Sequence, residues 1–179
     1  MCGSWTQMRY ESIDAAVTVT TDKFPESHER IRASMMFLNP IACNTVMMRR
    51  SAFTERGLTF RPAFGNTLDY DMWSNASDTM RVCNLPLALA AYRVHASQTS
   101  QGAALDRMND HALQVQVELI GRALGIEMTD DERGTHRSAT IAPVVIDSLD
   151  QLDSIARWFG TLKSANDAQG AFDRTEFNQ

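Results

Sequence analysis

The sequence has 179 residues, of which 44% are hydrophobic, and it carries a formal net charge of −5 with a pI near 5.3. This length and apolar content suffice for one domain, or for one compact body with a helical appendage. The acidic balance excludes binding to nucleic-acid backbones as a main role, because such binding depends on clustered Lys and Arg side chains.

The first elements along the chain are a strand and a helix. The β-branched run at residues 16–21 is typical of a strand. Ser27 is a good N-cap for a helix through about Phe37, since apolar residues recur behind it at helical spacing. Pro40 ends this helix, because the residue before a proline is pushed out of the helical region. The mostly apolar residues 41–48 predict a buried strand.

Two helices follow, and the second carries a pair of carboxylates. Residues 49–53 predict a short helix that stops at the next glycine. Residues 69–76 predict another helix, with Thr67 as its N-cap and with Asp69 and Asp71 near its positive end. One interpretation is that the two carboxylates only cap this helix. They do not predict a metal site, because side chains two residues apart diverge by about 200° around a helix.

The character of the chain changes near Gly102. Residues 87–92 predict a last buried strand, whereas apolar residues after Gly102 recur at helical spacing. Capping boxes that begin at Thr129 and Ser148 predict two further helices. We therefore expect an α/β body of a few mixed strands with flanking helices in residues 1–101, and a C-terminal helical extension in residues 102–179.

The sequence also predicts a cytoplasmic protein without a transmembrane segment. Its longest apolar run, residues 85–92, is far shorter than the ~18 to 20 residues that cross a bilayer. The first residues lack the basic and apolar regions of a signal peptide. Cys2, Cys43 and Cys83 are odd in number and widely spaced, so we expect reduced thiols.

Five motifs, in this order, resemble the second half of family-2 glycosyltransferases. They are Asn39-Pro40-Ile41, Thr45-Val46-Met47-Met48-Arg49-Arg50, Asp69-Tyr70-Asp71-Met72-Trp73, Asn84-Leu85-Pro86 and Tyr92-Arg93-Val94-His95. Gly3-Ser4-Trp5 also resembles the strand that follows the metal-binding motif of that family. The resemblance implies the acceptor-binding half of a GT-A-like mixed sheet, without the nucleotide-binding half and its Asp-x-Asp motif.

The resemblance implies that Asp69 is the catalytic residue. In this family the carboxylate of a Glu-Asp pair is the general base for the acceptor hydroxyl, which is a poor nucleophile until a positioned base accepts its proton. Leu68 stands where the family has the Glu, which removes a negative charge and a hydrogen-bond acceptor. Two further departures are at Cys43-Asn44, where relatives often carry a His, and at Met48, where Phe is usual.

The resemblance also implies roles for five other side chains. Asp71, Trp73, Arg49 and Arg93 are expected at the acceptor pocket, and His95 is expected near the diphosphate or its metal. Each of three has an alternative role: Trp73 packs in the core, His95 only hydrogen-bonds within the fold, and Arg49 is solvated rather than bonded to the catalytic loop.

The resulting hypothesis is the acceptor-binding portion of a glycosyltransferase that moves a sugar from a nucleotide-diphosphate donor to a hydroxyl acceptor, and that is inactive without its other half. The intact enzyme is expected to use Mn²⁺ or Mg²⁺ with the nucleotide-diphosphate sugar. Expected partners are a sugar or glycan acceptor, and either a separate nucleotide-binding half or a second copy of the chain, because half a sheet exposes apolar surface. The alternatives are a non-catalytic interaction module or truncated remnant of such an enzyme, and a metal hydrolase that uses Asp69, Asp71 and His95.

Overall fold

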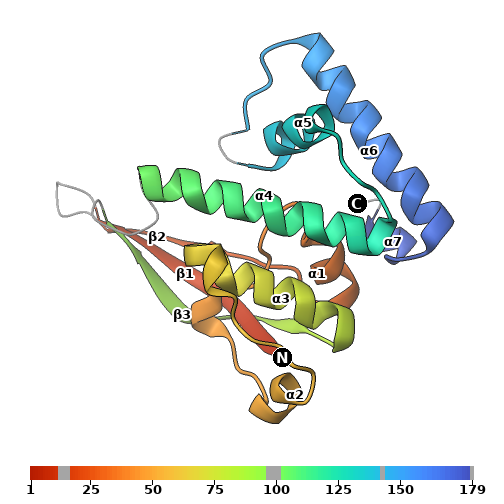
Figure 1. Cartoon of the computed structure of the whole chain (residues 1–179). Coiled ribbons are helices and arrows are strands. Elements are labelled where there is room, and N and C mark those ends of the chain that lie inside the picture. The colour runs from red at the N-terminus through yellow and green to blue at the C-terminus, as the bar shows by residue number, and fades with distance from the viewer. Residues whose placement is uncertain (12–16, 96–101, 142–143, 178–179) are drawn as a thin grey trace.

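The computed structural model describes residues 1–11, 17–95, 102–141 and 144–177 (Figure 1). It is an α/β fold with a three-stranded mixed sheet in the order β2-β1-β3. The strands are β1 (Cys2–Glu11), β2 (Val17–Asp22) and β3 (Cys83–Val94). β1 pairs antiparallel with β2 and parallel with β3, so the predicted α/β class with a mixed sheet is confirmed.

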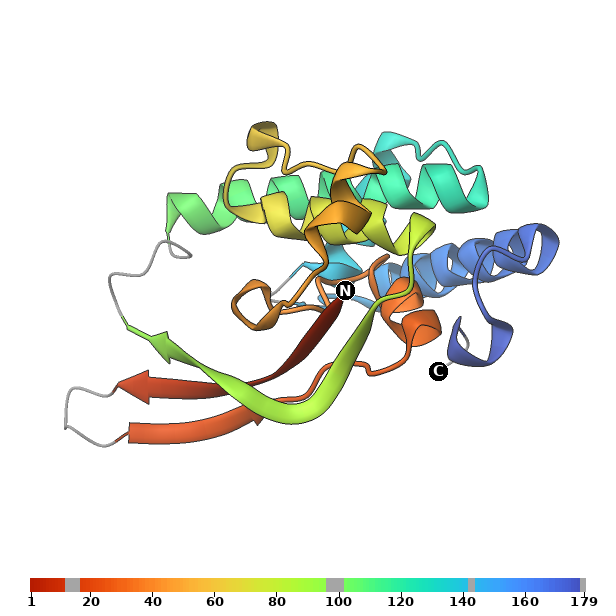
Figure 2. The ribbon, with the colours of Figure 1, turned by 90° about the horizontal axis from the view of Figure 1, so that it is seen from below.

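The helices lie on one side of the sheet, which forms a curved band along the edge of the molecule (Figure 2). They are α1 (His28–Ser34), α2 (Arg50–Thr54), α3 (Leu68–Thr79), α4 (Ala103–Leu124), α5 (Asp130–Thr140), α6 (Leu149–Gln169) and α7 (Arg174–Phe177). Within the described residues, no helix is long and apolar enough to cross a membrane.

The predicted strand at residues 41–48 is wrong. Residues 43–45 form a 3₁₀ turn, and Met47 makes only an isolated bridge to Cys2 and is 80% exposed. β1 is already flanked by β2 on this side from Thr6 onward, which leaves only its first residues for pairing. The Thr45 side chain fixes the turn instead, because its hydroxyl accepts from Ser4 N at 3.0 Å and donates to the Ala42 carbonyl at 2.8 Å.

The last predicted strand exists, but its burial was predicted wrongly. Leu85, Leu87 and Leu89 of β3 are 42%, 57% and 64% exposed. Every residue from 85 to 89 is exposed, because β3 is an edge strand of the sheet and the helices do not cover this stretch of it. Apolar surface therefore remains exposed at this edge of the sheet.

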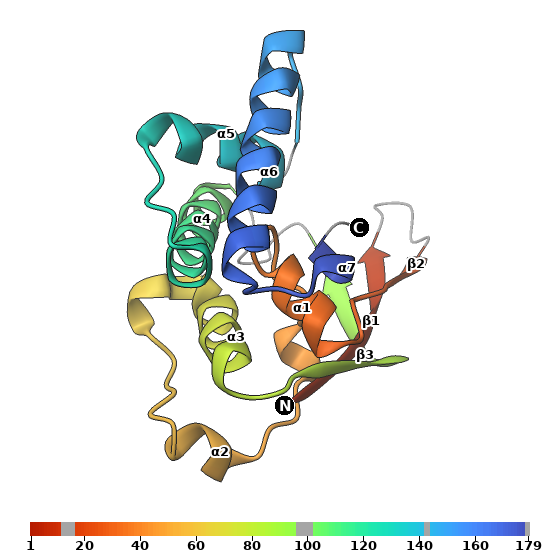
Figure 3. The same cartoon turned by 90° about the vertical axis from the view of Figure 1, so that its right-hand side faces the viewer.

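The helical character after residue 102 is confirmed, and no strand occurs there in the described part of the chain. Thr129 and Glu132 form the expected reciprocal capping box, and Ser148 caps α6 by accepting from Gln151 N. Figure 3 shows α6 standing beside α4 and α5, with its upper end extending beyond the rest of the fold. One continuous apolar core includes Trp73 of α3 and Ile120 of α4, so the helices after residue 102 share the core of the α/β body.

Asn84 ties the start of the sheet to the loop that carries the site. Its amide nitrogen donates to the Pro25 carbonyl at 2.7 Å and to the Pro40 carbonyl at 2.9 Å. Gly3 lies against it, since a Cβ at this glycine would be 2.4 Å from the Asn84 amide oxygen. The close approach of β1 to β3 therefore fixes the position of residue 40 and of its neighbour Asn39.

Candidate functional site

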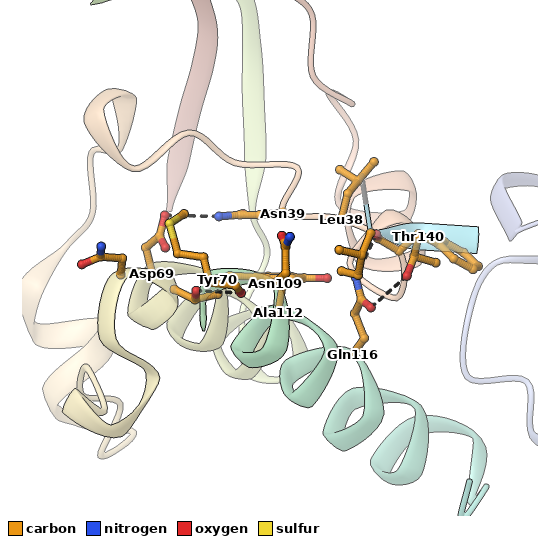
Figure 4. A pocket seen from close by; sticks show the side chains of 13 residues that line it. Leu38, Asn39, Asp69, Tyr70, Asn109, Ala112, Gln116 and Thr140 are labelled. Atoms are coloured by element: carbon orange, nitrogen blue, oxygen red, sulfur yellow. Dashed lines mark hydrogen bonds between the residues drawn. The ribbon is translucent and has the colours of Figure 1, made fainter. Parts of the chain in front are cut away.

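Asp69 lies in the first turn of α3, between two cavities (Figure 4). Thr67, two residues before Asp69, holds the N-cap position, as predicted, but its hydroxyl does not cap the helix. It donates instead to the Met108 carbonyl of α4 at 3.2 Å. The start of α3 is therefore fixed by a helix more than thirty residues later in the chain.

A single amide orients the Asp69 carboxylate. Asn39 donates from its side-chain nitrogen to Asp69 Oδ2 at 3.2 Å, and its amide oxygen accepts from Ile41 N at 3.2 Å. Burial raises the pKa of the Asp69 carboxyl above its ordinary value, against hydrogen bonds from the Tyr70 backbone, from Asn39 and from its own backbone that lower it. A higher pKa makes Asp69 a stronger base than an exposed aspartate.

The first cavity, which we call the helix-side cavity, has a volume of about 290 Å³. Asp69 lies at one end of it, and α4 and the end of α5 form much of its wall (Figure 4). Its lining residues are Phe37, Leu38, Asn39, Asn66, Thr67, Asp69, Tyr70, Met108, Asn109, Ala112, Gln116, Thr140 and Ile141.

The second cavity, which we call the sheet-side cavity, has a volume of about 380 Å³. It is lined by Thr6, Met8, Asp22, Phe24, Ala42, Cys43, Asn44, Asn66, Asp69, Tyr92 and Met108. The Thr6 hydroxyl is buried and has no hydrogen-bond partner among the described residues. Burial, followed by the nearby charge of Asp69, raises the pKa of the Cys43 thiol, which therefore stays protonated at neutral pH.

Asp71 does not line either cavity, because it forms a buried ion pair on another side of α3. The Arg61 guanidinium donates to both Asp71 oxygens and, at 2.8 Å, to Glu118 of α4. Asn75 adds a hydrogen bond to Asp71 Oδ1 at 3.0 Å. The carboxylates of Asp69 and Asp71 are thus separated as the helical spacing predicted, and the structure gives Asp71 a contact that joins α3 to α4.

The other sequence-predicted site residues lie away from the two cavities. Trp73 is fully buried and packs edge-on against Phe53, at a centroid distance of 6.4 Å, so it takes the core position of its alternative interpretation. Arg49 is exposed at the start of α2, and Arg93 is exposed on β3 opposite Arg9.

His95, the expected metal ligand, follows β3 and is half-buried. Among the residues that the structure describes, no group of three or more His, Cys, Asp or Glu side chains could hold a metal ion. The described residues therefore do not by themselves form a metal site.

Sequence reasoning missed most of the cavity walls. Asn66 and Met108 line both cavities, and Asn109 and Gln116 line the helix-side cavity, yet none was singled out. The residues on α4 appear in the sequence as part of an amphipathic helix, and only the packing of α4 onto α3 brings them to Asp69. The sequence motifs did include other lining residues, namely Asn39, Tyr70 and Tyr92, and Cys43-Asn44 was noted as a departure from the family.

Comparison with known proteins gives one partial relationship. No family model and no solved structure matches the chain. An uncharacterized glycosyltransferase of Haemophilus influenzae is 40% identical over 78 residues, which are 44% of this chain and 24% of that protein. The match spans about a quarter of that relative's length. The chain is thus related, over part of its length, to a protein named as a glycosyltransferase.

Proposed function

We propose that this chain is the acceptor-binding portion of a glycosyltransferase of family 2, in which Asp69 is the general base. The observation that carries the proposal is a half-buried carboxylate, with a raised pKa and a fixed orientation, at the junction of two cavities. A general base must contact the acceptor hydroxyl at the point where that hydroxyl approaches the anomeric carbon of the donor sugar. A carboxylate between an acceptor cavity and a donor cavity has this position.

The reaction transfers a sugar to a hydroxyl group. The acceptor oxygen forms a bond to the anomeric carbon, the bond from that carbon to the departing diphosphate breaks, and the acceptor proton passes to Asp69. Asn39 helps to orient this carboxylate, which lines both cavities. Leu68 stands beside Asp69 in place of a second carboxylate, so the base meets no neighbouring negative charge from that position.

The nucleotide diphosphate and its divalent cation, Mn²⁺ or Mg²⁺, belong in this proposal to residues outside this chain. The described residues provide no cluster for the metal, and both cavities lack cationic side chains for a diphosphate. A nucleotide-binding half, joined to this chain or separate from it, would supply them. The greater length of the Haemophilus influenzae relative is compatible with such a half.

The test is sugar transfer by this chain assembled with a nucleotide-binding half. Asp69→Asn should lower turnover by ~10²- to 10⁴-fold, since the amide keeps the shape but does not accept the proton. Donor binding should be retained. Asp71→Asn is the matched control, because it changes the same group two residues away in an ion pair outside the cavities. Equal turnover by the Asp69→Asn and unmodified enzymes would refute the proposal.

A non-catalytic interaction module is the second candidate. The exposed row of Leu85, Leu87 and Leu89 favours it, because such a row suits contact with another chain. The two candidates differ in their dependence on Asp69. A module would bind its partner equally well with Asp69 or Asn at this position, and would show no transfer with any donor.

A further inference from the structure

We propose that the helix-side cavity is the acceptor subsite and that α4 and α5 make it selective for an uncharged sugar residue. The inference rests on the proposed function, since it assigns a role to one of the two cavities beside Asp69. It adds a substrate class and gives a recognition role to residues of α4, which the sequence motifs did not single out.

The wall of the helix-side cavity suits a single sugar ring. A volume of about 290 Å³ is at the small end of ligand sites, which typically begin near ~300 Å³. Leu38, Met108 and Ala112 provide apolar surface for the carbon face of a ring. Asp69 and Asn109 provide polar groups for its hydroxyls (Figure 4). This mixture of apolar wall and few polar groups is typical of small-molecule sites.

Most of the other polar groups in this wall are already used by the fold. Gln116 donates to the Phe37 carbonyl at 2.9 Å and accepts from Thr140 at 3.2 Å, and the Tyr70 hydroxyl donates to the Met35 carbonyl. These hydrogen bonds fix the wall, but they leave few donors and acceptors free to bind a ligand.

Asn109 is different from these residues. Its side chain is half-buried, and it makes no hydrogen bond to another described residue. Figure 4 shows it directed from α4 toward Asn39. A carboxamide presents both a donor and an acceptor, which matches a hydroxyl that also does both. Asn109 is therefore the side chain of α4 that is available to recognise a sugar.

The charges of the cavity decide which sugars fit. Among the residues that the structure describes, its lining contains no Lys, Arg or His, and Asp69 is the only ionisable group apart from the buried Tyr70 phenol. A phosphorylated or acidic sugar would meet the negative charge of Asp69 without a compensating cation, which disfavours it. An uncharged sugar loses only the hydrogen bonds of its hydroxyl groups to water, and hydrogen bonds to the side-chain amides of the cavity replace them. The cavity should therefore select neutral acceptors.

The test uses the whole chain, isotopically labelled, with simple probes and no donor. The neutral probes are the methyl glycosides of glucose, galactose and N-acetylglucosamine, and the anionic probes are glucose 6-phosphate and glucuronate. We expect neutral probes to shift the NMR signals of the Asn109 amide and the Met108 methyl at millimolar concentration. Asn109→Ala should weaken that binding by about five- to tenfold, the value of one hydrogen bond.

Gln114→Ala is the matched control, because it removes an amide from the exposed face of the same helix, where Gln114 bonds Glu118. Stronger binding of either anionic probe, equal affinity in the Asn109→Ala and Gln114→Ala chains, or no shift at Asn109 would each overturn the proposal. The Asp69→Asn variant distinguishes this proposal from the proposed function, because it should lose sugar transfer but still bind neutral probes. If neutral sugars bind but the assembled enzyme transfers nothing, only the proposed function fails.

Discussion

Acid should weaken the wall of the helix-side cavity through His136. This histidine of α5 is fully buried between the turn after α1 and α6. Its Nε2 is 3.0 Å from the Met36 carbonyl, and its Nδ1 accepts from the Trp158 indole N–H at 2.9 Å. Both bonds require the neutral ring with its proton on Nε2. Burial lowers the pKa of His136 from 6.5 to about 4, although the Met36 carbonyl opposes this effect.

The direction of the pH effect follows from these values. Between pH 6.5 and 4 the unfolded chain binds a proton at His136, whereas the folded chain does not. The stability that the neutral His136 contributes is therefore fully present above pH 6.5 and is lost as the pH falls toward 4. Each unit by which the pKa of His136 differs between the folded and unfolded chain corresponds to about 1.4 kcal/mol, so the full loss of unfolding free energy is about 3 kcal/mol. Between pH 7.5 and 5.0 the loss is about 2 kcal/mol.

The assay is urea and thermal unfolding at pH 7.5 and pH 5.0. A loss of about 2 kcal/mol lowers the melting temperature of a chain of this size by about 4 to 8 °C. His136→Gln should lack this part of the pH dependence. Trp158→Phe should retain a smaller part, because protonated Nδ1 no longer faces the indole N–H donor. The same difference between pH 7.5 and 5.0 in the unmodified and His136→Gln chains would refute the reasoning.

Three further predictions concern other groups. Asp69→Asn should raise the melting temperature at pH 7, because the raised pKa of Asp69 means that its ionisation costs stability as the pH rises; an advantage that persists below pH 3 would contradict this. Arg61→Met should cost about 1 to 3 kcal/mol in urea unfolding, because it leaves the buried Asp71 carboxylate without its half-exposed cation; a loss below about 0.5 kcal/mol would contradict that role. Cys2 and Cys83 occupy paired positions with sulfurs 3.1 Å apart, so diamide should link them; mass spectrometry that shows two free thiols after treatment would contradict this.

The local signals of the sequence predicted the helices well. Ser27 accepts from Arg30 N at 3.2 Å, and Thr129 forms its capping box with Glu132. Such caps act between residues three apart, so the sequence contains the whole interaction. Strand pairing does not share this property. Residues 41–48 looked like a strand, but whether an edge of β1 was free for them depended on β2, far from them in the sequence.

The candidate site could be predicted only in part for a similar reason. Asp69 could be identified because it lies in a contiguous motif. Its cavity could not, because the wall comes from α4 and from the end of α5, about forty and seventy residues later. The pairing of Cys2 with Cys83 was missed because it depends on the parallel register of β1 and β3.

The error about the burial of β3 has a different origin. A strand with apolar residues on both sides normally has both faces covered, yet in this chain residues 85–89 of β3 are exposed at every position. A nucleotide-binding half packed against β3, as we propose, would account for this difference, because the residues of a strand are selected in the assembled protein. The proposed nucleotide-binding half would then cover the exposed side chains of Leu87 and Leu89.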